Sequence, residues 1–163
     1  KKLLDSSKLT SGAKVFLHNV SKPELYGVAK VNKKNLITII KEKPKKHLSN
    51  HAVTGLYFFD NKVVNYAKKL KPSKRGELEI IDLLNIYRAK RKLKADCIGR
   101  GGAWQDAGSF DDFYKTTSFV SAIENRQGVE IACVEEIALL NKWITKKERV
   151  SAIKFYGNCD YSK

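Results

Sequence analysis

The sequence predicts an α/β or α+β fold in which a sheet, formed mainly by the first half of the chain, is followed by a helical C-terminal appendage. Two observations favour this order. Short segments rich in β-forming residues fill the first half, and apolar residues at helical spacing dominate the last third. With 163 residues, 42% of them hydrophobic, the chain is long enough for one domain with a substantial core.

The predicted strands are short segments rich in Val, Ile, Leu, Tyr and Phe, separated by breakers such as Ser-Lys-Pro and Asn-Lys-Lys-Asn. The segment 52–59 is continuously apolar rather than alternating, which predicts a central strand that is buried on both faces. We expect strands at 13–20, 26–31, 36–41, 52–59 and 93–98.

Helical spacing of apolar residues accounts for most of the remaining chain. Asp60 is a suitable N-cap for a first helix, which Pro72 would end. Glu77 and Glu79 fall in the first turn of a second helix, where the helix dipole favours acidic residues. The apolar stripe of that second helix consists of Ile80, Leu83, Leu84 and Tyr87. The predicted helices cover 61–70 and 77–90, with further helices within 110–123 and 135–144.

The formal net charge is +15, and so basic a chain must be considered as a nucleic-acid binder. The lysines are dispersed through every segment and no familiar nucleic-acid-binding module is visible, which favours a solvated lysine-rich surface. No apolar run approaches the roughly 20 residues that a membrane span needs, and the first residues lack an apolar signal-peptide core. We therefore expect a cytoplasmic protein with no nucleic-acid and no membrane partner.

The chain contains no methionine, which leads us to expect a fragment of a longer gene product. Its cysteines, Cys97, Cys133 and Cys159, are odd in number and widely spaced, so neither a disulfide framework nor a zinc ribbon is expected, and we interpret them as reduced and structural. His47 and His51 are four residues apart, but no third ligand accompanies them and a metal site there is not expected.

Three clusters of polar, charged and glycine residues lie in loops or at strand ends, where binding residues are often found. Glu42 and Lys43 combine an acceptor for sugar hydroxyls with a donor for a phosphate, although a solvated charge run gives the same pattern. Basic residues in the segment 73–80 precede a helix whose N–H groups can receive an anion, with ordinary capping as an equal alternative. In the loop 101–108, Asp106 can hold Mg²⁺ or serve as a turn residue.

In their order and spacing, these clusters resemble the second half of the glucose-1-phosphate thymidylyltransferases of dTDP-rhamnose synthesis. The resemblance runs from about Lys14 to the C-terminus. The matching segments are 26–28, 42–44, 49–60, 70–80, 99–101, 104–108, 123–128 and 133–138.

The resemblance implies a Rossmann-like, mixed-sheet nucleotidyltransferase fold and a role in making a lipopolysaccharide or O-antigen precursor. In that reaction the phosphate of glucose 1-phosphate attacks the α-phosphorus of dTTP and expels pyrophosphate, giving dTDP-glucose. It also implies Mg²⁺ as cofactor and assembly into homotetramers. The family's glycine-rich triphosphate loop and first Mg²⁺-binding aspartate belong to an N-terminal half. This chain is therefore expected to be inactive alone and to need a complementing N-terminal half.

The resemblance also assigns roles to individual residues. Glu42 would accept hydrogen bonds from the glucose hydroxyls, and Lys43 and Arg75 would act as the catalytic cations that hold the sugar phosphate. Asp106 would ligate the Mg²⁺. The sugar site would be completed by Tyr26, Gly27 and Val53, largely through their main chain, and by the nearby Tyr57.

The resemblance divides the chain into a sugar-phosphate-binding half, 1–126, and a helical segment for oligomerisation and regulation, 127–163. Gln105 and Ala107 depart mildly from the family's pattern beside the retained aspartate, and Leu140 replaces an arginine that many members have near the regulatory site. Two alternatives stay open: a non-catalytic sugar-nucleotide-binding or assembly module, and a basic nucleic-acid-binding domain. Related enzymes that use UTP, CTP or ATP also stay open.

Overall fold

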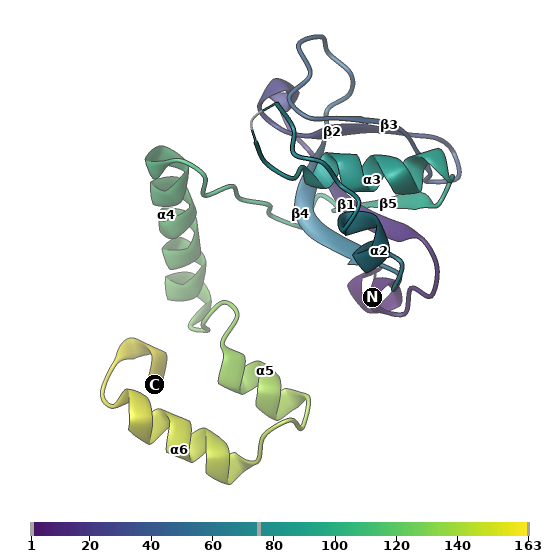
Figure 1. Ribbon diagram of the computed structural model, residues 1–163. Coiled ribbons are helices and arrows are strands. Elements are labelled where there is room, and N and C mark those ends of the chain that lie inside the picture. Colours follow the sequence, from purple (N-terminus) through teal and green to yellow (C-terminus); the bar gives the residue numbers. More distant parts are fainter. Residues whose placement is uncertain (1, 75, 163) are drawn as a thin grey trace. The chain divides into compact units, whose positions relative to one another are not determined.

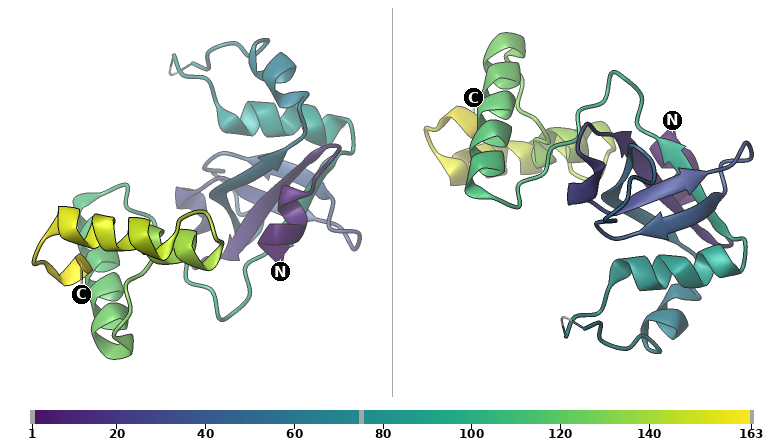
Figure 2. Two further views of the ribbon diagram at one scale, coloured as in Figure 1. Left: turned by 90° about the horizontal axis from the view of Figure 1, so that it is seen from below. Right: turned by 90° about the horizontal axis from the view of Figure 1, so that it is seen from above.

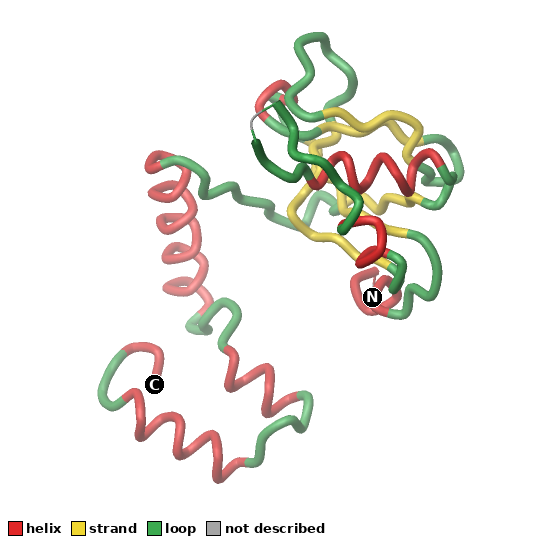
Figure 3. The backbone as a smooth tube through the Cα atoms, in the orientation of Figure 1, coloured by secondary structure: helices red, strands yellow, loops and turns green. Residues whose placement is uncertain are grey.

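The computed structural model of the chain describes residues 2–74 and 76–162 (Figure 1). The chain divides into two compact units, Lys1–Trp104 and Gln105–Lys163, which we name the sheet unit and the helical unit. Among the described residues, every strand belongs to the sheet unit (Figure 3). The predicted α/β fold with a helical C-terminal part is therefore confirmed. The division at 126/127 concerns function and stays a prediction.

The sheet unit contains a five-stranded mixed sheet with the strand order β3-β2-β4-β1-β5. Among the strands of the described residues, the β1–β5 pair is parallel, and the β1–β4, β2–β3 and β2–β4 pairs are antiparallel. All five predicted strands are present, with small shifts at their ends. They are β1 (Ala13–Asn19), β2 (Val28–Val31), β3 (Ile37–Lys41), β4 (His51–Phe59) and β5 (Leu93–Cys97).

Helices α2 (Val63–Ala67) and α3 (Ile80–Ala89) lie on one side of the sheet, and the short helix α1 (Lys2–Ser7), which was not predicted, lies on the other (Figure 2). The core forms between the sheet and α3, where Leu84 and Tyr87 join buried side chains from the strands. Alternate residues of a strand share a face, so Ala13, Val15 and Leu17 all reach this core.

Helix α3 begins later than predicted. Glu79 is its N-cap and Glu77 precedes it, so neither lies in the first turn. The cause is a turn before the helix, in which the Ser73 hydroxyl donates a hydrogen bond to the Glu79 carboxylate at 2.9 Å. Ile81 rather than Ile80 therefore belongs to the buried stripe, together with the predicted Leu83, Leu84 and Tyr87.

The prediction that Asp60 is the N-cap of the following helix is wrong. The N-cap of α2 is Lys62, which makes no side-chain capping bond, and the helix ends at Ala67, well before Pro72. Asp60 is buried instead. Its carboxylate accepts hydrogen bonds from the Gly12 N–H (2.7 Å), the Tyr87 hydroxyl (2.8 Å) and the Lys62 N–H (3.1 Å).

The predicted burial of β4 on both faces holds only for its first part. Ala52, Val53 and Thr54 are buried, whereas Gly55 and Leu56 are exposed and the last three residues are half-buried. β1 pairs along nearly the whole strand, but β2 reaches its other edge only at Ala52. Strand pairing and burial thus decline together along β4.

The helical unit consists of α4 (Phe110–Gln127), α5 (Val134–Leu140), α6 (Lys146–Tyr156) and connecting turns. Helices α4 and α5 fall where helical spacing predicted them, and α6 was missed. The sequence could have predicted the start of α6 from its capping box, in which the side chains of Thr145 and Glu148 each accept a hydrogen bond from the other residue's main-chain N–H. Within the described part of this unit, no helical side chain is buried, and Phe110 is 98% exposed.

The basic residues are not spread evenly between the units. Lysine and arginine greatly outnumber acidic residues in the sheet unit, while the helical unit is close to neutral. The positive charge is thus a property of the sheet unit. Across the described chain, no helix combines the length and the apolar character that crossing a membrane would require.

Candidate functional site

Several of the predicted site residues meet at one end of the β2–β3 hairpin. In this hairpin Val28 lies opposite Lys41, so the residues just before β2 face those just after β3. The Lys43 N–H donates a hydrogen bond to the Tyr26 carbonyl at 3.1 Å. On the neighbouring strand, the Val53 N–H donates to the Gly27 carbonyl at 2.7 Å. These main-chain bonds fix Gly27 between the hairpin end and β4.

Gly27 and Glu42 are in close contact. A Cβ atom at Gly27 would lie 2.9 Å from the Glu42 Oε2 atom and 3.2 Å from the Ile81 Cδ1 atom. Any side chain at position 27 would therefore displace the carboxylate. The absence of a side chain is what allows Glu42 to lie over the strand end, with Ile81 of α3 beside it.

The Glu42 carboxylate also influences Tyr57 of β4. Burial raises the pKa of the Tyr57 hydroxyl, and the negative charge of Glu42 raises it further. Tyr57 therefore stays protonated near neutral pH and offers a hydrogen-bond donor. The carboxylate accepts hydrogen bonds and the phenol can donate them, which is the combination that a polyhydroxylated ligand needs.

The side chain of Tyr26 belongs to a different group. Its ring packs edge-on against Trp104, with ring centres 5.1 Å apart, and the Trp104 ring lies 6.0 Å from His18. His18 lies opposite Ala52 across the β1–β4 ladder. Val53 follows Ala52 and so points to the other face. The Tyr26 carbonyl thus meets Lys43 at the hairpin end, while the Tyr26 ring lies in this aromatic group.

Sequence reasoning did not select Trp104, His18 or Ile81 as site residues. Trp104 lies in the glycine-rich loop that the sequence had indicated as a possible binding segment, so its position could have identified it. Nothing in the sequence indicated His18, because a histidine at a strand end is common. Its Nδ1 atom is buried and has no hydrogen-bond partner within 2–74 and 76–162.

Lys43 adopts a left-handed backbone conformation, with φ at 35°. This conformation is unfavourable for residues with a Cβ atom and is concentrated at turns and functional sites. Lys43 is exposed and lies two residues after the end of β3, next to Glu42 in the chain. An ammonium and a carboxylate are therefore adjacent at the hairpin end.

The two remaining predicted residues are Arg75 and Asp106. Arg75 lies outside the described residues. Asp106 belongs to the helical unit, where it is exposed and its Oδ1 atom accepts a hydrogen bond from the Gly108 N–H at 3.2 Å. This bond is typical of an aspartate in a turn.

The donor set can be compared with what Mg²⁺ requires. This cation prefers oxygen ligands and is often held by one or two carboxylates together with substrate phosphates. Asp106 offers one exposed carboxylate of the right kind. In the described part of the chain, no group of three or more His, Cys, Asp or Glu side chains is placed to hold a metal. Asp106 thus suits a shared site, completed by phosphates and further carboxylates.

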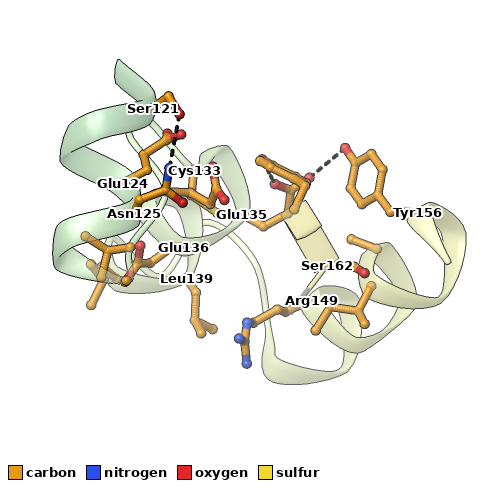
Figure 4. A pocket seen from close by; sticks show the side chains of 17 residues that line it. Ser121, Glu124, Asn125, Cys133, Glu135, Glu136, Leu139, Arg149, Tyr156 and Ser162 are labelled. Carbon is orange, nitrogen blue, oxygen red and sulfur yellow. Dashed lines mark hydrogen bonds between the residues drawn. The ribbon is translucent and has the colours of Figure 1, made fainter. Parts of the chain in front are cut away.

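A separate cavity of about 740 Å³ lies within the helical unit (Figure 4). Glu135 stands at its wall and accepts hydrogen bonds from the hydroxyls of Tyr161 (2.5 Å) and Tyr156 (3.0 Å). The bond from Tyr161 is the main reason that the pKa of Glu135 is lowered. Arg149 and Leu140 also line this cavity, but none of the predicted substrate-binding residues does.

The three cysteines do not form a common site. Cys97 and Cys159 are exposed and Cys133 is half-buried. The interpretation of these cysteines as reduced and structural stays a prediction.

Comparison with known proteins relates these features to one family. Residues 2–122 match the family model described as nucleotidyl transferase. A glucose-1-phosphate thymidylyltransferase from Neisseria meningitidis serogroup A is 44% identical over 146 residues, which are 90% of this chain and 51% of that protein. The enzyme of the same name from Neisseria gonorrhoeae is 45% identical over 161 residues, 99% of this chain and 56% of that protein. The chain thus spans about half the length of the curated relatives it matches.

Two solved structures are also similar to this chain. A Bacillus anthracis protein assigned as a glucose-1-phosphate thymidylyltransferase, and solved in complex with a sucrose, is 41% identical with a TM-score of 0.61. The match covers 72% of this chain and 46% of that one. A UDP-glucose pyrophosphorylase complexed with UDP-glucose has a TM-score of 0.59 at 24% identity, covering 66% of this chain and 43% of that one. This second likeness concerns the fold alone.

Proposed function

Because this chain belongs to the nucleotidyl transferase family, we propose that it carries the sugar-phosphate-binding half of a glucose-1-phosphate thymidylyltransferase. The relatives that share 44–46% of its residues bear that name. The observation that carries the proposal is the placement of Glu42 against Gly27, with Tyr57 beside it and Lys43 next in the chain.

In this proposal, Glu42 orients glucose 1-phosphate by accepting hydrogen bonds from its hydroxyls, and the Tyr57 hydroxyl donates one. The aliphatic side chain of Ile81 lies close to this carboxylate, which is itself exposed to solvent. A carboxylate held in this way distinguishes a sugar from a simple phosphate ester, because only the sugar supplies several donors to it.

The reaction joins two anions. An oxygen of the sugar phosphate forms a bond to the α-phosphorus of dTTP, the bond from that phosphorus to the β-phosphate bridge breaks, and pyrophosphate leaves with the electron pair. The Lys43 ammonium lowers the repulsion between the reactants and holds the sugar phosphate in line. Arg75 is proposed for the same role. Asp106 would help to hold Mg²⁺, which when bound neutralises phosphate charge.

The helical unit is proposed to mediate homo-oligomer formation, with a tetramer as the expected state. Its support is the number of large apolar side chains on α4–α6 that this unit leaves exposed, including Leu140, Trp143 and Phe155. Sedimentation velocity on the chain would test this point. A monomer at all concentrations would contradict it.

Replacing Lys43 tests the proposed function. Calorimetric titration of glucose 1-phosphate into the chain should give binding that Lys43→Ala weakens about tenfold or more, because a charge-assisted hydrogen bond to phosphate is lost. Lys45→Ala is the matched control, since Lys45 is an equally exposed lysine two residues away, and it should change affinity less than about twofold.

Turnover is tested by adding the N-terminal half of the Neisseria gonorrhoeae relative, dTTP and Mg²⁺, and measuring pyrophosphate release. Activity that depends on Lys43 but not on Lys45 supports the assignment. Equal effects of the two substitutions on binding would remove it. Sugar-nucleotide binding without turnover would favour a non-catalytic module instead.

A further inference from the structure

Two exposed turns of the sheet unit lie side by side at one end of the sheet. One is the β2–β3 turn, 32–36, and the other is the α3–β5 turn, 90–92. The Ala95 N–H donates a hydrogen bond to the Asn35 carbonyl at 2.8 Å, and Leu36 forms an antiparallel bridge with Lys94. Figure 1 shows the two turns together, beside the C-terminal end of α3. Segments that are far apart in the sequence thus form one surface.

This surface, which we name the basic end, collects lysine and arginine side chains. Its members are Lys33, Lys34, Arg88, Lys90, Arg91, Lys92 and Lys94. The lysines and Arg91 are exposed, and Arg88 is half-buried and donates a hydrogen bond to the Thr38 carbonyl at 3.2 Å. The stretches 28–41 and 83–95 contain no acidic residue. Within residues 2–74 and 76–162, no ion pair includes a member of the basic end.

The β2–β3 turn is held by Asn32 rather than by its lysines. The Asn32 Oδ1 atom accepts hydrogen bonds from the Lys34 N–H (2.9 Å) and the Leu36 N–H (3.0 Å). This arrangement fixes the backbone of the turn without using an ammonium group. In the neighbouring turn, the Lys92 Nζ atom donates a hydrogen bond to the Ser11 hydroxyl at 3.2 Å, which leaves its charge uncompensated. The charges of the basic end are therefore available to a partner.

The basic end and the proposed sugar site lie at opposite ends of the β2–β3 hairpin. Val28 pairs with Lys41 at one end, next to Gly27 and Glu42, whereas the turn 32–36 closes the other end. A strand rises about 3.3 Å per residue, so the two ends are on the order of 10 Å apart or more. Within the sheet unit, a large partner at the basic end therefore leaves the Glu42 carboxylate accessible.

We propose that the basic end binds the surface of a membrane that contains anionic lipids. Each lysine or arginine near such a surface strengthens binding about fivefold, and clusters of about four to eight of them are typical of surfaces that bind anionic lipids. The ammonium groups would contact the headgroup phosphates at the membrane surface. This proposal replaces the expectation of no membrane partner, which rested on the dispersal of the lysines along the sequence.

A nucleic acid offers the same phosphate groups, but the basic end lacks the features that favour one. Single strands are bound by stacking of their bases on aromatic rings, and the stretches 32–36 and 88–94 contain no aromatic residue. Base edges in a duplex are read by an element that enters a groove. Helix α3 contributes its C-terminal end to this surface, where the helix dipole is unfavourable for phosphates. A lipid surface requires neither stacking nor insertion into a groove.

Flotation of the whole chain with lipid vesicles tests the proposal. Vesicles of phosphatidylcholine mixed with phosphatidylglycerol should bind the chain at low salt, and vesicles of phosphatidylcholine alone should not. Raising the ionic strength to about 0.5 M shortens the screening length to about 4 Å and should release the chain. Equal binding to neutral vesicles, or retention at high salt, would contradict an electrostatic contact with anionic lipids.

Two double variants with the same net charge locate the contact. Lys33→Gln/Lys34→Gln removes two adjacent exposed lysines from the basic end and should weaken binding to anionic vesicles about tenfold or more. Lys146→Gln/Lys147→Gln removes two adjacent exposed lysines from α6 of the helical unit and should weaken it less than about twofold. Circular dichroism establishes that both variants fold. Equal losses would show that net charge, rather than the basic end, attracts the chain, and would overturn the proposal.

Duplex DNA provides the comparison with a nucleic-acid partner. If DNA at an equal phosphate concentration and the same salt releases the chain from anionic vesicles, the basic end belongs to a nucleic acid and the proposal is overturned. Absence of binding to anionic vesicles at low salt also overturns it. The proposed function is tested separately, because Lys33→Gln/Lys34→Gln should bind glucose 1-phosphate as the native chain does.

Discussion

At the scale of single residues, Gly27 decides where the Glu42 carboxylate lies. Replacing it by alanine brings a methyl group within 2.9 Å of the Glu42 Oε2 atom. The free end of a glutamate can move at little cost, so we expect Gly27→Ala to lower the free energy of unfolding by only about 1 kcal/mol. The displaced carboxylate should weaken glucose 1-phosphate binding about tenfold.

Gly55→Ala is the matched control for this substitution, because its added methyl group meets nothing within 4 Å. Calorimetric titration and thermal unfolding of both variants check the expectation. Unchanged sugar-phosphate affinity in Gly27→Ala would show that the position of Glu42 does not matter for binding.

At the scale of elements, Asp60 ties three parts of the sheet unit together. It ends β4, binds the Gly12 N–H just before β1, and receives the Tyr87 hydroxyl from α3. Burial acts to raise the pKa of Asp60, but the hydrogen bonds from Gly12, Tyr87 and Lys62 outweigh it, so the pKa lies below its usual value. The carboxylate is therefore ionised in the folded protein and serves as a shared acceptor.

Asp60→Asn should lower the free energy of unfolding by about 2–4 kcal/mol at pH 7. The substitution removes the negative charge, and the NH₂ group of the asparagine amide cannot accept the hydrogen bonds that the carboxylate accepts. A lowered pKa in the folded state means that the unfolded state binds more protons as the pH falls. The stabilisation is thus complete above the usual aspartate pKa of about 4 and is lost as the pH falls through the lower folded value.

Urea unfolding at several pH values measures this effect. The difference between the native chain and Asp60→Asn should shrink on acidification below about pH 4. Asp96→Asn is the control, because the Asp96–Lys14 ion pair at 3.1 Å is partly exposed and should contribute less than about 1 kcal/mol. A difference independent of pH would contradict the role of the Asp60 charge.

At the scale of the whole molecule, the two units differ in how they are stabilised. The sheet unit has a contiguous buried core, whereas no described helical side chain of α4–α6 is buried. Helices without a packed face are only marginally stable in water. We expect the amides of α4–α6 to exchange with deuterium far faster than those paired between β1 and β4, in a dilute sample that prevents association.

Raising the chain concentration provides the comparison for this prediction. If self-association covers the apolar side chains of the helical unit, exchange in α4–α6 should slow while exchange in β1 stays unchanged. Equal, strong protection of both units in dilute solution would mean that the helical unit is stabilised by interactions within a single chain.

Much of this protein could be determined from the sequence by itself. Strand composition located the five strands of the described chain, and helical spacing located α3, α4 and α5. The pairing of Glu42 with Lys43 after a strand, and the resemblance of whole segments, identified the residues that meet at the hairpin end. These signals are local, because composition and spacing record which residues favour strands, helices and burial.

Only the tertiary structure decided which distant groups meet. The bond between Gly12 and Asp60 joins residues 48 positions apart, and no local pattern distinguishes such a buried carboxylate from a helix cap. The turn at Ser73 shifted the start of α3, and tertiary packing brought the ring of Tyr26 against that of Trp104. The decline of burial along β4 has the same origin. An apolar run records that a strand favours burial, but which strand covers it depends on the folded chain and its partners.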